Sequence, residues 1–158
     1  MKILLTGATG FLGSHLARAL VKNRHTVIGL KRRPSDLSRL SDVKEALSFA
    51  DIEDGLDRLF EDYPDIELVI HAATSYGNQG EPLSQVLTAN VILPLGIMEA
   101  ALLRKPCVFI NTDTFFCKAK DDYSYLADYV LSKKLFCELG TAFAKKNRRL
   151  FINIRLEH

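Results

Sequence analysis

Short apolar runs and stretches of helical periodicity alternate along the whole chain. Runs typical of strands buried on both faces occupy residues 3–5, 26–30, 46–50, 68–70, 107–110 and 150–154. Apolar positions recur every three to four residues at 11–20, 56–61, 83–103 and 123–146. This rotation predicts an α/β fold with one doubly wound parallel sheet of about six strands and helices on both faces. We expect one domain over residues 1–158, with its ligand site beyond the carboxyl ends of the strands.

Composition and charge narrow the possible partners. The 158 residues are 47% hydrophobic and 25% charged, which is typical of a globular domain. A net charge of +2 lacks the basic character of nucleic-acid binders, so we expect no nucleic-acid partner. The three cysteines, Cys107, Cys117 and Cys137, show neither disulfide nor zinc spacing, which predicts no metal site and a cytoplasmic protein. Glycines begin at position 7, too early for a signal peptide or a membrane span, and we expect no membrane partner.

Three glycines with G-x-x-G-x-x-G spacing follow the first predicted strand. Gly7 allows a sharp turn, Gly10 lets a pyrophosphate approach the backbone, and Gly13 lets the helix pack close to the strand. Free N–H groups at the start of the helix would face the anion. This pattern predicts a dinucleotide-binding loop of the Rossmann type, although a glycine-rich turn without a ligand is the alternative. The predicted cofactor-binding residues of the loop are Gly7, Thr9, Gly10, Phe11, Leu12 and Gly13.

This spacing and the run TGATGFLGSHL resemble the extended short-chain dehydrogenase/reductase superfamily, within its NAD-dependent epimerase/dehydratase family. The resemblance covers nearly the whole chain. It implies a nicotinamide dinucleotide as cofactor and a nucleotide sugar as substrate. In the family, the chain continues beyond the position of Arg155 into a smaller substrate domain, which is absent here. We therefore expect residues 1–158 to bind the dinucleotide but to hold a sugar nucleotide poorly. Leu156-Glu157-His158 is either natural sequence or the start of a tag.

The turn after the second predicted strand carries three basic residues, Lys31, Arg32 and Arg33. NAD enzymes place an acidic residue here to bind the ribose diol, whereas guanidinium groups pair with the 2′-phosphate of NADP. We therefore expect NADP(H), bound first by Arg32 and then by Arg33 or Lys31, with NAD(H) still possible. A solvated basic turn is the alternative interpretation.

Two further segments are similar to cofactor-lining parts of the family. Asp51-Ile52 resembles the segment whose aspartate meets the adenine amino group, but an ordinary helix N-cap would explain Asp51 equally well. His71-Ala72-Ala73 resembles a segment whose small residues let the backbone approach the dinucleotide, although His71 itself can be a packed residue at a strand end. Asn90 matches a family asparagine that braces the site through the helix backbone, and a solvated mid-helix asparagine is the alternative.

Tyr129 and Lys133 lie four residues apart on a predicted helix and therefore share a face. The superfamily carries its reacting tyrosine and lysine on this helix, so the resemblance implies that both residues are catalytic and contact the cofactor. A free tyrosine has a pKa of about 10, and a neighbouring ammonium lowers it by favouring the phenolate. An amphipathic helix that simply exposes both side chains is the alternative.

The end of the fifth predicted strand reads Asn111-Thr112-Asp113-Thr114. The resemblance makes Thr112 the catalytic hydroxyl that binds the substrate oxygen, with Thr114 nearby, unless Thr112 is an ordinary strand-end residue. The family's 4,6-dehydratases have Thr-Asp-Glu here, and the missing glutamate disfavours dehydration.

The segments INTDTFF and YVLSKK are similar to CDP-abequose synthase-like reductases, which use NADPH to reduce a CDP-4-keto-dideoxyhexose. We therefore expect such a nucleotide-sugar 4-ketoreductase, active in deoxysugar and surface polysaccharide biosynthesis. An NAD-dependent nucleotide-sugar epimerase and a non-catalytic dinucleotide-binding module are the alternatives.

The helices at 83–103 and 123–146 carry apolar residues on more than one face, which suggests a homodimer as in the superfamily, or simply deep burial against the sheet.

Overall fold

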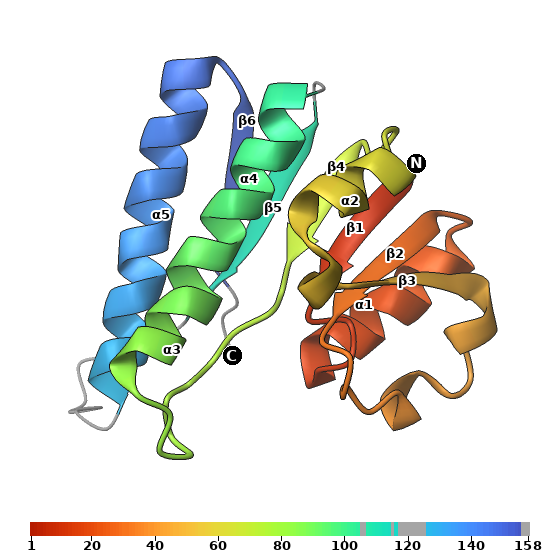
Figure 1. Cartoon of the computed structure of the whole chain (residues 1–158), viewed down its shortest axis with the longest axis horizontal. Coiled ribbons are helices and arrows are strands. Elements are labelled where there is room, and N and C mark those ends of the chain that lie inside the picture. Colours follow the sequence, from red (N-terminus) through yellow and green to blue (C-terminus); the bar gives the residue numbers. More distant parts are fainter. Residues whose placement is uncertain (105–106, 115, 117–125, 156–158) are drawn as a thin grey trace.

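Six parallel strands form one sheet in the order β3-β2-β1-β4-β5-β6 (Figure 1). The computed structural model describes residues 1–104, 107–114, 116 and 126–155. The strands are β1 (Lys2–Thr6), β2 (Thr26–Lys31), β3 (Leu47–Asp51), β4 (Leu68–His71), β5 (Val108–Asp113) and β6 (Leu150–Arg155). The helices are α1 (Phe11–Lys22), α2 (Leu56–Asp62), α3 (Leu83–Leu87), α4 (Leu93–Arg104) and α5 (Ala127–Asn147). Short turns add η1 (Ser38–Leu40), η2 (Lys44–Ala46), η3 (Ile52–Asp54) and η4 (Thr88–Ile92).

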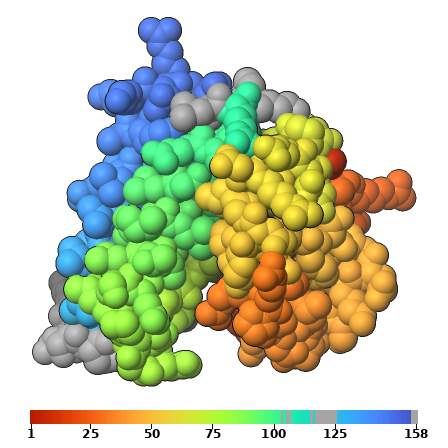
Figure 2. All heavy atoms as spheres, viewed as in Figure 1, coloured from red at the N-terminus to blue at the C-terminus, as the bar shows by residue number. Residues whose placement is uncertain are grey.

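The strand order confirms the doubly wound sheet that the sequence predicts. The order reverses between β1 and β4, and such a switch point opens a crevice at the carboxyl ends of the strands. Figure 2 shows the molecule hollowed between the green segment that carries α3 and the orange segment that follows β2.

Two long helices differ in detail from their predicted form. The helix expected over 83–103 is continuous, but residues 88–92 (η4) form a π-helical turn between α3 and α4. Such turns are rare and occur frequently at functional sites. The helix expected over 123–146 is described from Ala127 to Asn147. Its predicted start at residues 123–125, together with Cys117 and residues 156–158, lies outside the described residues.

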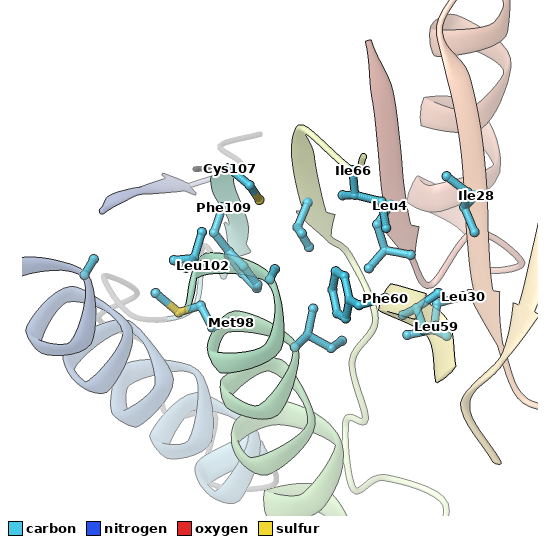
Figure 3. Packing of buried hydrophobic residues seen from close by; sticks show 14 of the residues in the cluster. Leu4, Ile28, Leu30, Leu59, Phe60, Ile66, Met98, Leu102, Cys107 and Phe109 are labelled. Carbon is cyan, nitrogen blue, oxygen red and sulfur yellow. The ribbon is translucent and has the colours of Figure 1, made fainter. Parts of the chain in front are cut away.

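Alternate residues of the strands build a core on each face of the sheet. On one face, Leu4 and Phe109 pack with α2, α4 and α5, as Figure 3 shows. On the other face, Ile3 and Leu5 pack with α1 and η1. Because successive strand residues point to opposite faces, one apolar run such as Ile3-Leu4-Leu5 supplies both cores. This double burial explains why the strands are recognisable as continuous apolar runs.

The stretch Leu83–Leu102 is long and apolar enough to cross a membrane by length and composition, with a mean hydropathy of 1.5. In this fold the stretch lies along the sheet, where Ile97, Met98 and Leu102 are fully buried in the core. Its place is that of a core helix, and the absence of a membrane partner stays a prediction.

Candidate active site

The turn between β1 and α1 has the backbone geometry that its glycines predict. Gly7 has φ = +68°, a conformation that side chains rarely adopt, and a Cβ atom there would lie 2.6 Å from the Ala73 nitrogen. A Cβ atom on Gly13 would lie 2.0 Å from the Gly7 carbonyl oxygen. The sharp turn at Gly7 and the close packing at Gly13 are therefore confirmed.

Gly10 differs from the other two glycines. Its φ of −77° suits any residue, and a Cβ atom there would meet only the Gly7 oxygen, at 3.2 Å. Helix α1 begins directly afterwards without a side-chain cap, and Ser14 N donates to Gly10 O to close its first turn. The N–H groups of residues 11–13 consequently lack acceptors within the helix. Thr9 lies in the turn, and the Phe11 ring is exposed beside His15, so Phe11 offers the site its N–H rather than its side chain.

Thr6 joins the ends of β1 and β4. Its Oγ1 accepts hydrogen bonds from Ala72 N at 3.2 Å and Ala73 N at 3.1 Å, and lies 2.8 Å from His71 Nδ1. His71 is fully buried, and burial together with the charge of Lys133 lowers its pKa to about 3. The imidazole is therefore neutral and packed at the strand end, which is the alternative interpretation given above. Cofactor contact by the backbone of Ala72-Ala73 stays a prediction.

Tyr129 and Lys133 lie on the face of α5 that covers the sheet, where they are only 5% and 2% exposed. Lys133 Nζ donates to the Thr112 carbonyl oxygen at 2.6 Å, at the carboxyl end of β5. The Tyr129 ring packs 4.6 Å from the Tyr76 ring and 6.5 Å, edge to face, from Phe116. The alternative of an exposed Tyr/Lys pair is therefore wrong, since the sheet buries both side chains at the expected crevice.

The side chains of Thr114 and Tyr76 lie close enough to the Tyr129 hydroxyl to influence its pKa. Burial raises the pKa of Tyr129 to about 12, with further increases from Tyr76 and Asp113 and an opposing hydrogen bond from Thr114. The pKa of this phenol is thus raised, with burial as the largest cause, and Lys133 Nζ donates to a backbone carbonyl oxygen. A lowering of the pKa by Lys133 and a bound nicotinamide ring stays a prediction.

The two threonines at the end of β5 have different partners. Thr112 Oγ1 donates to the His71 carbonyl oxygen at 3.0 Å, across to the end of β4. Thr114 is buried, and its Oγ1 accepts a hydrogen bond from Phe116 N at 3.3 Å. Contact between the Thr112 hydroxyl and a substrate stays a prediction. Tyr76 is a site residue that the sequence did not reveal, because it lies in an irregular loop without periodicity or motif.

Asn90, in the π-helical turn, is a buried hub of hydrogen bonds. Its Oδ1 accepts from Ser75 N at 2.7 Å and Thr74 Oγ1 at 3.1 Å. Its Nδ2 donates to Ser75 O at 2.7 Å and Ser132 Oγ at 2.9 Å, and Ser132 in turn donates to Tyr129 O. A solvated asparagine is thus excluded. The expected bracing is present, but it runs through the backbone of the loop after β4 rather than through the helix backbone.

Comparison with known proteins agrees with this geometry. Residues 3–158 match the NAD dependent epimerase/dehydratase family. The chain belongs to this family. It is similar to CDP-abequose synthases of Salmonella muenchen and Salmonella typhimurium, with 37% and 34% identity over 158 residues. These alignments cover 99% of this chain but only 53% and 52% of the relatives, so the chain spans about half their length.

A solved UDP-glucuronic acid 4-epimerase from Bacillus cereus, in complex with NAD, has a TM-score of 0.81 and 26% identity to this chain. That likeness covers 98% of this chain and 55% of the epimerase. The family match and these relatives confirm the resemblance to the extended short-chain dehydrogenase/reductase superfamily, including its CDP-abequose synthase-like members. The chain is thus a member of a family of NAD-dependent enzymes.

In this epimerase/dehydratase-family chain, acidic residues already pair with much of the basic turn after β2. Lys31 Nζ lies 2.5 Å from Asp51 Oδ1, and these residues are register partners on β2 and β3. Arg33 forms ion pairs with Asp54 and, at 3.9 Å, with Asp51. No ion pair joins Arg32 to any of the described residues. Asp51 occupies the N-cap position of η3, but its side chain forms no capping bond there. Adenine contact by Asp51-Ile52 stays a prediction.

Proposed function

We propose that this chain is the cofactor-binding part of an NADPH-dependent reductase that acts on a 4-keto nucleotide sugar of the CDP-4-keto-dideoxyhexose type. The observation that carries the proposal is the buried Tyr129–Lys133 pair at the carboxyl end of β5. The likeness to CDP-abequose synthases supports this substrate class. The complete enzyme would combine this chain with the substrate domain expected from the family.

The residues of the first turn fit a nicotinamide dinucleotide. The packing of the chain itself makes little demand for glycine at position 10, because a Cβ atom there has a single close neighbour. A glycine at this position leaves the N–H groups of residues 11–13 open to a diphosphate. When bound, the reduced nicotinamide supplies a hydride. Tyr129 provides the proton for the carbonyl oxygen, and Lys133 is the residue that would hold the nicotinamide ribose.

The Tyr129 phenol can serve as the proton donor of a reduction. Burial raises its pKa to about 12, so the phenol is protonated at neutral pH.

The surroundings of Asp113 argue against dehydration. Its carboxylate accepts hydrogen bonds from Thr114 N at 2.8 Å, Asn153 Nδ2 at 2.9 Å and Arg155 Nη2 at 3.3 Å. These donors hold Asp113 as a structural anion at the ends of β5 and β6. Position 114 supplies a threonine where the dehydratases have a glutamate. No acid–base pair for removing water is therefore present at residues 113–114.

Arg32 is the residue expected to select the cofactor. It is exposed on the basic turn, whereas Lys31 and Arg33 form ion pairs with neighbouring acidic residues. A guanidinium without such a partner suits the 2′-phosphate of NADPH. The proposed preference therefore depends mainly on Arg32 and much less on Lys31, whose charge is paired with Asp51.

Fluorescence titration of this chain with NADPH and NADH tests the cofactor. We expect tighter binding of NADPH, and we expect Arg32→Ala to weaken NADPH binding roughly tenfold, about 1.4 kcal/mol, while NADH binding changes little. Arg58→Ala, on the exposed surface of α2, is the matched control. Equal or stronger binding of NADH by the unmodified chain would instead favour the NAD-dependent epimerase.

A homodimer remains part of the proposal. Leu131, Leu135 and Leu139 form an exposed stripe along α5, and Ile92 is exposed on the neighbouring helical stretch. The three leucines lie one helical turn apart on α5, away from the face that carries Tyr129 and Lys133. The idea that both helices are simply buried against the sheet is therefore incomplete. An apolar stripe of this kind supports pairing with a second copy.

A further inference from the structure

Three nitrogen atoms surround the Thr6 hydroxyl at the end of β1. Ala73 N donates to Thr6 Oγ1 at 3.1 Å, and Ala72 N, which is shared with the Thr6 carbonyl oxygen, donates at 3.2 Å. The third nitrogen is His71 Nδ1, at 2.8 Å. A hydroxyl oxygen has two lone pairs and one proton, so the two N–H groups leave only the proton for the imidazole. Thr6 therefore donates to His71 Nδ1, and the neutral imidazole carries its own proton on Nε2.

The opposite tautomer does not fit these contacts. A proton on His71 Nδ1 would bring a third donor to an oxygen that accepts two hydrogen bonds. The Thr6 hydroxyl proton would then have no acceptor in the hydrogen bonds of the described residues. Thr6 and His71 are 1% and 0% exposed, so bulk water does not reach either side chain. The hydrogen bonds therefore fix the tautomer.

A histidine is an unfavourable choice for packing alone at position 71. Its Nε2 is buried without a hydrogen-bond partner among the described residues. The imidazole packs against Phe109 and Phe136, with ring centroids 6.2 and 5.7 Å away. A leucine would fill this apolar site without burying an unpartnered N–H group. The one thing that a leucine does not supply is the acceptor at Nδ1, so the chemical need for His71 comes from Thr6.

The Thr6 hydroxyl holds the segment that borders the glycine loop. Gly7 follows Thr6 directly, and a Cβ atom on Gly7 would lie 2.6 Å from Ala73 N and 2.7 Å from Ala72 C. The Ala72-Ala73 peptide thus lies against Gly7, at the switch point between β1 and β4. Because Thr6 Oγ1 binds the N–H groups of both alanines, its orientation fixes the end of β4 beside the loop proposed to bind the diphosphate.

We propose that His71 is a positioning residue for the dinucleotide, because its Nδ1 accepts the Thr6 proton and so directs the Thr6 lone pairs at Ala72 N and Ala73 N. This inference rests on the dinucleotide binding proposed above. Without an acceptor at Nδ1, the hydroxyl can rotate, and both N–H groups lose a fixed partner. The crevice wall beside Gly7 then loosens. Cofactor binding weakens although the imidazole itself does not touch the cofactor.

Two variants of His71 separate positioning from packing. In His71→Asn, the side-chain oxygen lies nearly where Nδ1 was and can accept the Thr6 proton, but the ring contacts are lost and an amide N–H is buried. In His71→Leu, an apolar side chain fills the site, but the acceptor is absent. Fluorescence titration should show NADPH binding within about threefold of the unmodified chain for His71→Asn, and roughly tenfold weaker binding for His71→Leu. Thermal unfolding should rank the variants in the opposite order, with His71→Leu more stable.

This crossed ranking is what a merely structural role would not produce. If His71 only packed the core, NADPH affinity would follow stability, and His71→Leu would bind better than His71→Asn. Binding by His71→Asn that is no tighter than binding by His71→Leu overturns the proposal. His25→Leu, just before the amino end of β2, is the matched control and should leave NADPH binding unchanged. If His71→Leu does not fold, His71→Met, which also lacks an acceptor at this point, takes its place.

The tautomer is measured without any cofactor. Long-range ¹H–¹⁵N NMR of this chain, labelled at histidine, distinguishes protonation at Nδ1 from protonation at Nε2, and His71→Asn identifies the resonances of His71. We expect the proton on Nε2, and a ring that stays neutral into the acidic range because burial lowers its pKa to about 3. A proton on Nδ1 overturns the proposal, whatever the variants show.

Failure of the inference and failure of the proposed function give different results. If the unmodified chain binds neither NADPH nor NADH, the proposed function fails, and the inference fails with it. If the unmodified chain binds NADPH and His71→Leu binds it equally well, cofactor binding stands and only the positioning role of His71 is overturned.

Discussion

One half of the candidate site is built from backbone groups, and the other half is built from side chains. The loop at residues 7–13 presents backbone N–H groups, and its shape depends on the absence of side chains at Gly7 and Gly13. The region around Tyr129 depends on ring contacts with Tyr76 and Phe116, and Asn90 fixes the loop that carries Tyr76. The first half is determined by local chain geometry. The second is determined by contacts between segments far apart in the sequence.

The two halves should therefore tolerate different kinds of mutation. A methyl group added at Gly7 or Gly13 would force backbone atoms to overlap, so stability and binding should be lost together. Removing a hydroxyl from the Tyr129 region leaves the packing nearly intact, so chemistry is lost while the fold remains. Mutations that separate stability from activity therefore test whether the two halves really differ.

The largest effect is expected from Tyr129→Phe. Removing the proton donor should lower the rate of reduction by about 10²- to 10⁴-fold, the usual contribution of a positioned acid. NADPH affinity and the melting temperature should change little, because the ring keeps its contacts with Tyr76 and Phe116. Steady-state kinetics of the complete enzyme and fluorescence titration measure these quantities. Tyr63→Phe, at the end of α2, is the matched control.

A reduced rate accompanied by equal loss of NADPH binding would contradict this prediction. Such a result would mean that the phenol belongs to the binding half of the site.

The second effect is a contrast between Gly13→Ala and Gly10→Ala. A methyl group at position 13 would lie 2.0 Å from the Gly7 oxygen, and we expect a loss of about 3 kcal/mol in the free energy of unfolding. At position 10 the nearest atom is 3.2 Å away, and the loss should stay below about 1 kcal/mol. Gly10→Ala should nevertheless weaken NADPH binding roughly tenfold or more, because the methyl group occupies the space of the diphosphate.

Urea unfolding and NADPH titration of both variants check the contrast. Unchanged NADPH affinity in a folded Gly10→Ala variant would remove the diphosphate from this loop.

The same division explains what the sequence could predict. The parallel sheet follows from continuous apolar runs such as Ile3-Leu4-Leu5, and the glycine loop from spacing alone, because both depend on neighbours in the chain. The Tyr129–Lys133 pair is recognisable because both residues share one helix face. In each of these cases, local geometry carries the information.

The contacts that sequence reasoning missed connect distant segments. The Thr112 hydroxyl donates to the carbonyl oxygen of His71, which lies 41 residues earlier at the end of β4. Pairing of Lys31 with Asp51 follows from the register of β2 and β3, which the apolar pattern does not give. Burial of Tyr129 in the folded chain is the largest cause of its raised pKa. Each of these features requires the folded arrangement.

The smallest effect is expected from Tyr76→Phe. This variant tests whether the Tyr76 hydroxyl shifts the pKa of Tyr129, in addition to the packing of the two rings. Tyr76 raises the pKa of Tyr129, so its hydroxyl favours the protonated form. Removing that hydroxyl should lower the pKa of Tyr129 below about 12, and the loss of the proton donor should therefore begin at lower pH. The phenyl ring of the variant would keep the 4.6 Å stacking, so turnover at neutral pH should change only a few-fold. Tyrosine Cζ NMR and the alkaline limb of the kcat profile measure the shift. A pKa of Tyr129 that stays unchanged or rises in Tyr76→Phe would contradict this prediction.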